Sequence, residues 1–312
     1  MESKSNKNNL VSVIMNCFNS EKYIELSIKS VLEQTYTNWE LIIWDNCSTD
    51  NTSKVVEKFN DKRILYFSAN KHTSLGFARN EALKRTNGKF ISFIDSDDIW
   101  LSKKLEIQIN FIEKNKEINF VYSNHYVIDE NGKRVFRFDL WKKPIGKIFH
   151  SILRRNNTYI LTVLFESSFI KLESNLFDTN LELIEELEFF TRLLRKYNAG
   201  YIATPLAEYR VHPNMTTKLK YSKLPDEIDY LVRKLRRNCS PQDRETLSSI
   251  RYLECKNIYY RANLLMKSGK RSAASKLLYK IKFYSITFLL LYFLSLFNYR
   301  IWINFHRLMN RF

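Results

Sequence analysis

The sequence contains few of the residues that cross-link or interrupt a fold. Its 312 residues include four cysteines, six glycines and five prolines, and no two cysteines form a Cys-x-x-Cys pair. This usage argues against a disulfide framework and against a zinc site, and it is typical of reduced thiols in a cytosolic protein. The polar start MESKSNKNNL lacks the apolar core of a secretory signal, so secretion is not indicated.

Acidic residues are scarce in the last quarter of the chain. Residues 231–312 hold 17 Lys or Arg against three acids, so nearly all of the formal net charge of +17 lies there. Such a balance is expected of a solvated basic surface, of contact with anionic lipid, or of nucleic-acid binding. The cations alternate with Leu, Ile and Phe and no nucleic-acid-binding motif is present. We therefore expect an anionic membrane surface as the partner and no nucleic acid.

One segment of this basic region, residues 283–299, has no charged side chain and is flanked by Lys280, Lys282 and Arg300. Its 17 residues are at the short limit for crossing a bilayer. The aromatic residues and cationic flanks favour a helix that contacts the membrane peripherally. A buried helix ranks second and a membrane-spanning helix third.

Strand-like and helix-like segments alternate through the first hundred residues. Buried strands are predicted at residues 10–18, 39–45, 63–69 and 89–95, with helical spacing between them. This alternation predicts an α/β fold, Rossmann-like, whose mostly parallel sheet has helices on both faces.

The segments after residue 100 complete the predicted domain organisation. Two strands around a turn and a further strand follow residue 100, and beyond about residue 222 the patterns are helical only. We expect a catalytic domain over 1–220 and a basic helical region over 221–312.

The densest acidic cluster, Asp95, Asp97 and Asp98, directly follows the fourth predicted strand. Ligands bind at the carboxyl ends of strands in such sheets. Carboxylates this close repel one another unless protons or a cation neutralise them, and Mn²⁺ or Mg²⁺ prefers such oxygen ligands. Taken alone, Asp97 and Asp98 are better explained as caps of the next helix, because a D-x-D pattern is common.

The cluster is one of an ordered series of motifs. VSVIMNCFNSEKYIELSIKSVLEQTYTNWELIIWDNCSTDNT is followed by GFARNEAL, GKFISFIDSDDIW, FDTNLELIEELEFFTRL and YRVH. Over roughly residues 10–215 this series resembles glycosyltransferase family 2. The resemblance implies the GT-A fold and an inverting, metal-dependent transfer of sugar from a nucleotide-sugar donor, with a UDP-sugar favoured.

The resemblance implies donor-side roles for residues at the strand ends. They are Phe18, Asn19, Asp45, Asn46, Arg79, Asp95 and Asp97. Asp95 and Asp97 match the D-x-D of the family and would hold Mn²⁺ or Mg²⁺, Asp97 more directly. Asn46 departs from the usual aspartate at the nucleotide base, and an asparagine donates as well as accepts, so the base preference stays open. Arg79 could instead pair with Glu81 or with a neighbouring helix.

On the acceptor side, Glu185 and Glu186 match the "ED" pair of the family, which implies that Glu186 is the catalytic base. They would also suit the start of an ordinary helix. His212 could approach the metal or lie in a surface loop. Trp100 could stack on an acceptor sugar or belong to the core.

The expected function is therefore synthesis of a bacterial surface glycan on a glycan or lipid-linked acceptor, at the inner face of the cytoplasmic membrane. A nucleotidyltransferase would also use paired aspartates, but its Gly-rich phosphate loop is missing near residues 16–23. A nucleic-acid-binding protein is the other alternative.

Overall fold

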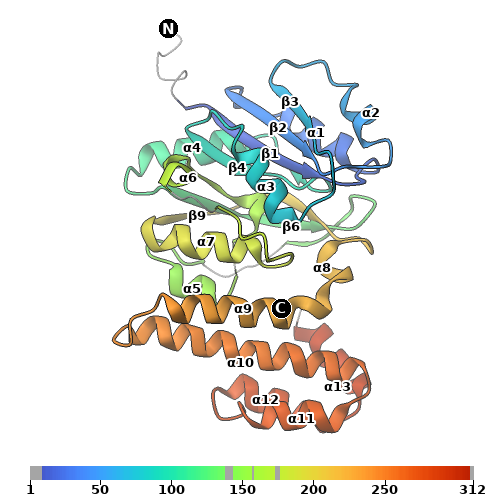
Figure 1. Ribbon diagram of the computed structural model, residues 1–312, viewed down its shortest axis with the longest axis vertical. Helices are drawn as coiled ribbons and strands as arrows, with labels where there is room; N and C mark the ends of the chain where they lie inside the picture. The colour runs from blue at the N-terminus through green and yellow to red at the C-terminus, as the bar shows by residue number, and fades with distance from the viewer. Residues whose placement is uncertain (1–8, 138–142, 157, 173–175, 310–312) are drawn as a thin grey trace. The chain divides into compact units, whose positions relative to one another are not determined.

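The computed structural model describes residues 9–137, 143–156, 158–172 and 176–309 (Figure 1). The chain divides into two compact units, residues 1–215 and residues 216–312. The first unit contains the sheet and the second is helical.

The four strands predicted from the first hundred residues form a parallel array. They are β1 (Val11–Cys17), β2 (Trp39–Asp45), β3 (Ile64–Ser68) and β4 (Phe90–Phe93), in the order β3-β2-β1-β4. Cys17 is level with Asp45 in the register, so β1 and β2 end together. Every residue of β1 is buried, as expected of a strand covered on both faces.

Helices of the expected pattern connect these strands. They are α1 (Ile24–Leu32), α2 (Thr52–Val56) and α3 (Leu75–Leu83). Ser74 caps α3 by accepting a hydrogen bond from the N–H of Phe77. Gly88 precedes β4, and a Cβ there would approach the backbone nitrogen of Ser12 to 2.6 Å, so glycine lets β4 lie close to β1.

The sheet continues beyond β4 with mixed strand directions. Its further strands are β5 (Ile99–Trp100), β6 (Phe120–Ile128), β7 (Arg134–Arg137), β8 (Leu164–Glu166) and β9 (Ala199–Arg210). After β4 the order is β8-β6-β9-β5, and β7 pairs with β6. The short β5 pairs antiparallel with β9, which brings the segment after the aspartates against the end of β9.

The remaining helices of this unit are α4 (Lys104–Lys114), α5 (Phe149–Arg154), η2 (Ile160–Thr162), α6 (Ser168–Leu172) and α7 (Glu185–Lys196). The side chains of Phe189, Phe190, Leu193 and Leu194 in α7 are fully buried. This apolar face fixes the first turn of α7, where Glu185 and Glu186 lie.

The second unit is built from helices alone in its described part. They are α8 (Thr216–Leu219), η3 (Tyr221–Lys223), α9 (Leu224–Arg237), α10 (Arg244–Lys267), α11 (Arg271–Tyr279), α12 (Ile286–Ser295) and α13 (Tyr299–Met309). Trp302 is buried in their core and donates from Nε1 to Asn263 Oδ1 at 2.9 Å.

The uncharged segment 283–299 forms α12 and its flanks. Phe288 and Leu291 of α12 are buried in the bundle, whereas Ile286 and Phe293 are exposed. Within the described residues, every helix is too short or too polar to cross a bilayer. The lowest-ranked interpretation of this segment, a spanning helix, is therefore wrong.

Candidate active site

The acidic loop at residues 95–98 is fixed by hydrogen bonds from three directions. The N–H of Asp98 donates to the carbonyl of Asp95 at 3.1 Å, which folds the loop into a turn. Ser27 Oγ donates to the Asp98 carbonyl at 2.7 Å, and the N–H of Arg210 donates to Asp98 Oδ1 at 2.8 Å. The buried Asp98 therefore serves as an anchor that joins the loop to β9.

Arg210 closes the same loop from the end of β9. Its Nε donates to the carbonyl of Asp97 at 2.7 Å, and one terminal nitrogen donates to the carbonyl of Asp129 at 3.2 Å. Its guanidinium lies over the ring of Tyr23 at 4.7 Å. Arg210 is almost completely buried, so it holds the backbone that presents Asp97.

The structure brings Asp97 and His212 together. His212 Nε2 lies 2.9 Å from Asp97 Oδ2, and both side chains remain partly accessible. His212 follows β9 and its ring packs 5.2 Å from that of Tyr23. His212 therefore lies in the loop after β9, with its ring directed at Asp97.

Arg79 connects the acidic loop to the start of α7. Its two terminal nitrogens lie 2.5 Å from Glu185 Oε1 and 3.3 Å from Asp95 Oδ1, and Arg79 and Glu185 are both buried. Glu81 pairs with Lys84 and Arg85, so the alternative pairing of Arg79 with Glu81 is wrong, whereas the alternative of a partner on a neighbouring helix agrees with the pairing to Glu185 of α7. Burial would lower the pKa of Arg79, but the carboxylates around it raise that pKa.

Three carboxyls of this site, those of Asp95, Asp98 and Glu186, have a raised pKa. Burial, reinforced by Asp97 and Asp95, holds the pKa of Asp98 well above its usual value, and burial also raises the pKa of Asp95. Burial, opposed by Arg79 and reinforced by Glu185 and Asp95, raises the pKa of Glu186 to about 8. A cation bound beside these carboxyls would favour their ionised form.

The side chains of this site could bind a divalent cation only if a bound substrate supplied further oxygen ligands. The described residues contain no group of three or more His, Cys, Asp or Glu side chains placed to hold a metal. Asp97 and His212 supply an accessible oxygen and nitrogen, and Asp95 lies on the same loop. Oxygens of a bound diphosphate would complete such a coordination shell, as is usual for Mg²⁺ sites.

Hydrogen bonds join the turn after β1 to the turn after β2. The N–H of Asn19 donates to Ser48 Oγ at 2.9 Å, and Asn19 Oδ1 accepts from the N–H of Thr49 at 2.8 Å. Asp45 is buried and accepts from Ser48 N–H and from the hydroxyl of Tyr66. In this structure Asn19 and Asp45 thus shape the backbone of the predicted base-binding edge.

The side chain of Asn46 is hydrogen-bonded to the segment that follows β3. Its Oδ1 accepts from the N–H and hydroxyl of Thr73 at 3.1 and 2.8 Å. Its Nδ2 donates to the Thr73 carbonyl at 2.8 Å and lies 3.4 Å from His72 Nδ1. A direct contact between Asn46 and a nucleotide base would have to replace these bonds.

The exposed surface at this edge comes from Phe18 and His72. Phe18 is 44% exposed and so is not a core residue, and its ring centroid lies 4.2 Å from that of His72. Sequence reasoning did not identify His72 or Thr73, because their role depends on the fold of the segment after β3 around Asn46.

Trp100 does not lie where an acceptor could reach it. It is 2% exposed, donates from Nε1 to the Leu161 carbonyl at 3.0 Å, and has the Lys104 ammonium 3.9 Å from its ring centroid. The acceptor-stacking prediction is therefore wrong and the core alternative is right. β5 pairs with β9, with Trp100 opposite Ala207, and of its two residues Trp100 is buried whereas Ile99 is partly exposed.

Comparisons with known proteins agree with this geometry. A family model described as glycosyl transferase family 2 matches residues 12–170. The chain is 35% identical over 230 residues to the Escherichia coli UDP-Glc:alpha-D-GlcNAc-diphosphoundecaprenol beta-1,3-glucosyltransferase WfgD, covering 71% of this chain and 85% of the relative. It is 30% identical over 215 residues to the putative teichuronic acid biosynthesis glycosyltransferase TuaG of Bacillus subtilis, covering 68% and 83%.

Solved structures show the same GT-A fold. S. aureus TarS 1–349 in complex with UDP-GlcNAc superposes with a TM-score of 0.66 at 19% identity, covering 86% of this chain and 80% of that one. The mannosyltransferase PcManGT from Pyrobaculum calidifontis, in complex with GDP-Man and Mn²⁺, gives 0.60 at 17% identity, covering 87% and 74%. The expected fold class, GT-A with a helical C-terminal region, is confirmed.

The buried ion pair of Arg79 and Glu185 predicts how single and double substitutions of its two residues change the stability of the protein. Arg79→Met leaves Glu185 buried without its cation and should lower the free energy of unfolding by about 3–5 kcal/mol, measured by urea denaturation. The double variant Arg79→Met/Glu185→Leu should recover a large part of that loss. If the single variant were as stable as the wild type, the pair would not organise the site.

Proposed function

The chain belongs to glycosyl transferase family 2 and is a glycosyltransferase, and we propose that it is an inverting, metal-dependent one that builds a bacterial surface glycan. The observation that carries the proposal is the constellation at the strand ends. The loop bearing Asp95 and Asp97 is locked by Arg210, and Arg79 links it to the helix start that bears Glu186.

Asp97, Asp95 and His212 would hold Mn²⁺ or Mg²⁺ in the proposed site. Bound there, the ion would neutralise the charge that develops on the leaving nucleoside diphosphate. The protein holds this binding loop rigid in advance, because Arg210 donates to its backbone and Asp98 anchors it to β9. Arg79 supplies a fixed positive charge beside Asp95.

Glu186 would take the proton from the attacking hydroxyl of the acceptor. The side chain of Asn156 hydrogen-bonds to it, and its raised pKa of about 8 makes it a strong base once ionised. Attack by that hydroxyl from the face opposite the leaving diphosphate would invert the anomeric carbon.

The relatives suggest the substrate classes. The names of two E. coli relatives, WfgD and WfaP, specify a UDP-glucose donor and an N-acetylglucosaminyl diphosphoundecaprenol acceptor. We therefore propose a UDP-sugar donor and a lipid-linked diphosphate acceptor. Phe18 and His72 form the exposed aromatic edge where the nucleotide base would lie. Turnover of a panel of UDP-, GDP-, CMP- and dTDP-sugars with Mn²⁺ and a synthetic alkyl diphosphate acceptor tests both choices.

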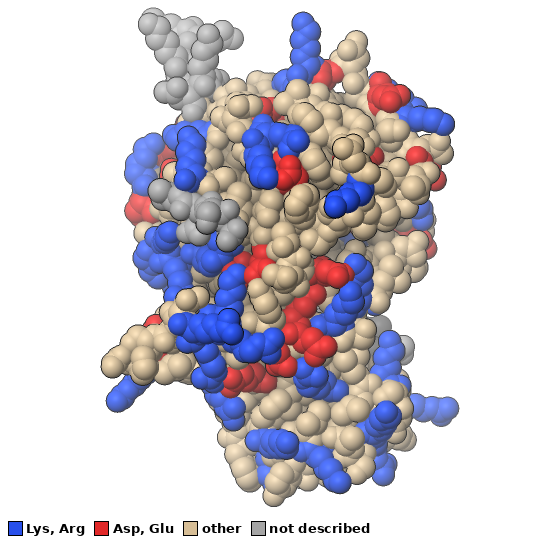
Figure 2. Space-filling model, viewed as in Figure 1, with Lys and Arg blue, Asp and Glu red and all other residues tan. Residues whose placement is uncertain are grey.

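The second unit offers a surface for the membrane that carries such an acceptor. Ile286, Leu290 and Phe293 of α12 and Phe297 just after it recur at helical spacing, and each is at least 50% exposed. The chain has no Asp or Glu after Glu254. On the face shown in Figure 2, the Lys and Arg side chains over α11 and α12 stand among uncharged residues with no acidic one visible. Apolar residues ringed by cations suit an anionic phospholipid surface.

This arrangement supports peripheral attachment at the inner face of the cytoplasmic membrane. The helix would lie in the interface with its exposed side chains among the acyl chains, while Lys280, Lys282 and Arg300 contact anionic headgroups. An acceptor with a lipid anchor would then meet the enzyme on the same surface.

The proposed role of Glu186 as the catalytic base predicts how kcat/KM depends on pH. Only the carboxylate form can accept a proton, and its pKa is raised to about 8, so kcat/KM should rise with pH and level off above that value. Glu186→Gln should still bind the donor but lose transfer, measured by product formation beside donor titration. Full transfer by this variant, or a rate that falls between pH 6 and 8, would contradict the assignment of the base.

The apolar face of α12 predicts a matched pair of lipid-binding results. The full-length variant Ile286→Glu/Phe293→Glu should lose about tenfold or more of its affinity for phosphatidylglycerol vesicles, because burial of each side chain contributes about 1.5–3 kcal/mol. Leu219→Glu is the control, since Leu219 is 69% exposed and Ile286 70%. Vesicle flotation measures both. If the double variant and the control floated equally well, the exposed face of α12 would not be the membrane-binding surface.

A further inference from the structure

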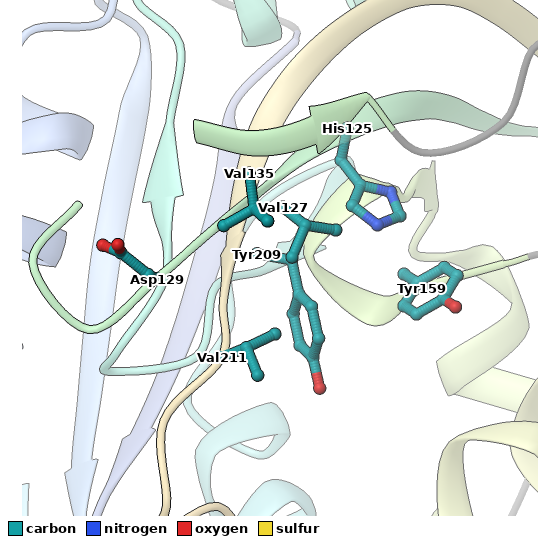
Figure 3. Close-up of a pocket in the computed structure, with 7 residues that line it drawn as sticks. All are labelled: His125, Val127, Asp129, Val135, Tyr159, Tyr209 and Val211. Carbon is teal, nitrogen blue, oxygen red and sulfur yellow. The ribbon is translucent and has the colours of Figure 1, made fainter. Parts of the chain in front are cut away.

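A pocket of about 270 Å³ opens beside the second half of the sheet (Figure 3). Its walls come from β6, β7, the end of β9 and the chain before η2, and they are formed by His125, Val127, Val135, Tyr159, Tyr209 and Val211. This volume is below the ~300–1,000 Å³ of drug-sized ligand sites and suits one sugar residue rather than an oligosaccharide.

One wall of the pocket is aromatic. The ring centroid of His125 lies 4.5 Å from that of Tyr159, and the two tyrosine rings are 5.8 Å apart. Figure 3 shows His125 and Tyr159 on one side of the Tyr209 ring, with Val211 and Val135 on the other. The C–H face of a pyranose ring packs well on such aromatic surfaces.

The pocket carries little charge. Burial, assisted by Lys143, lowers the pKa of His125 to about 3, so its imidazole is neutral at physiological pH. Asp129 lies at the edge, and its Oδ1 accepts from the N–H groups of Asn131 and Lys133. In Figure 3 the Asp129 carboxylate points away from the other labelled side chains. An uncharged group with apolar surface fits this environment best.

Two connections tie the pocket to the proposed reaction centre. Tyr209 lines the pocket and directly precedes Arg210, whose N–H and Nε hold the acidic loop. Asn156, which hydrogen-bonds to Glu186, lies three residues before Tyr159. Besides burial, the charges of Asp98, Asp95, Asp97 and Glu186 raise the pKa of Tyr209, so its phenol lies within electrostatic range of both the loop and the base.

We infer that this pocket receives the sugar ring of the acceptor, and that the ring is an N-acetylated amino sugar. Its apolar face would lie on Tyr159 and Tyr209, and its acetamido methyl group among Val127, Val135 and Val211. A sugar held there presents a ring hydroxyl to Glu186 while its lipid diphosphate extends from the pocket mouth. The inference rests on the proposed function, because it requires an acceptor that attacks beside Glu186.

A substitution at the pocket mouth tests the inference in the full-length enzyme. Val135 is 61% exposed, so Val135→Trp can narrow the mouth without disturbing the core. The control is Ile145→Trp, at an equally exposed residue outside the pocket, which is 63% exposed. Two synthetic acceptors serve as probes, the α-linked alkyl diphosphates of N-acetylglucosamine and of glucose.

The wild type should prefer the acetamido acceptor, and Val135→Trp should raise the acceptor KM relative to the donor KM by about tenfold or more, the equivalent of ~1.4 kcal/mol. Ile145→Trp should behave as the wild type. Tyr159→Ala should raise the acceptor KM in the same way and reduce the preference for the acetamido acceptor, whereas Tyr159→Phe, which keeps the ring, should retain both.

Two results would overturn the inference, and they are distinguishable. If the wild type transfers sugar but Val135→Trp and Tyr159→Ala leave the acceptor KM unchanged, the acceptor binds elsewhere and the proposed function stands. If the wild type uses the glucose and N-acetylglucosamine acceptors equally well, the sugar class is wrong. Absence of turnover with every donor and acceptor would refute the proposed function itself.

Discussion

The site depends on one buried guanidinium placed among carboxylates. Arg79 contacts Glu185 and Asp95 at once, so it joins the start of α7 to the loop after β4. Without that cation, two elements distant in sequence would each bring buried negative charge to the same place, at a cost of several kcal/mol. Burial raises the pKa of Asp95 and of Glu186, and neighbouring carboxylates add to that effect while Arg79 opposes it.

Much of the fold could be predicted from the sequence because its signals are local. The four parallel strands stand out as buried β-rich runs separated by helical spacing, and the observed β1, β2, β3 and β4 lie within the predicted ranges. The mixed half of the sheet was harder to anticipate. β5 and β8 are two and three residues long, and they form through pairing with distant strands rather than through their own pattern.

The residues of the site likewise divide into those that the sequence identified and those that it did not. The order of motifs pointed to Asp95, Asp97, Arg79 and Glu186, and the fold brings them to one edge of the sheet. Arg210 was missed as the residue that locks the acidic loop, because a backbone-to-side-chain bond across 112 positions leaves no periodic signal. The error for Trp100 has a related cause, since an aromatic residue after a binding loop looks the same in sequence whether it faces ligand or core.

In the proposed site, the acidic loop and a divalent cation together hold the diphosphate of the donor. Isothermal titration of UDP-sugars into the enzyme, with Mn²⁺ and with chelator, measures this cooperation. We expect Mn²⁺ to tighten binding to the wild type about tenfold or more and to leave binding to a folded Asp97→Ala variant unchanged. Equal affinity of the wild type with and without Mn²⁺, or an undiminished Mn²⁺ effect in Asp97→Ala, would contradict it.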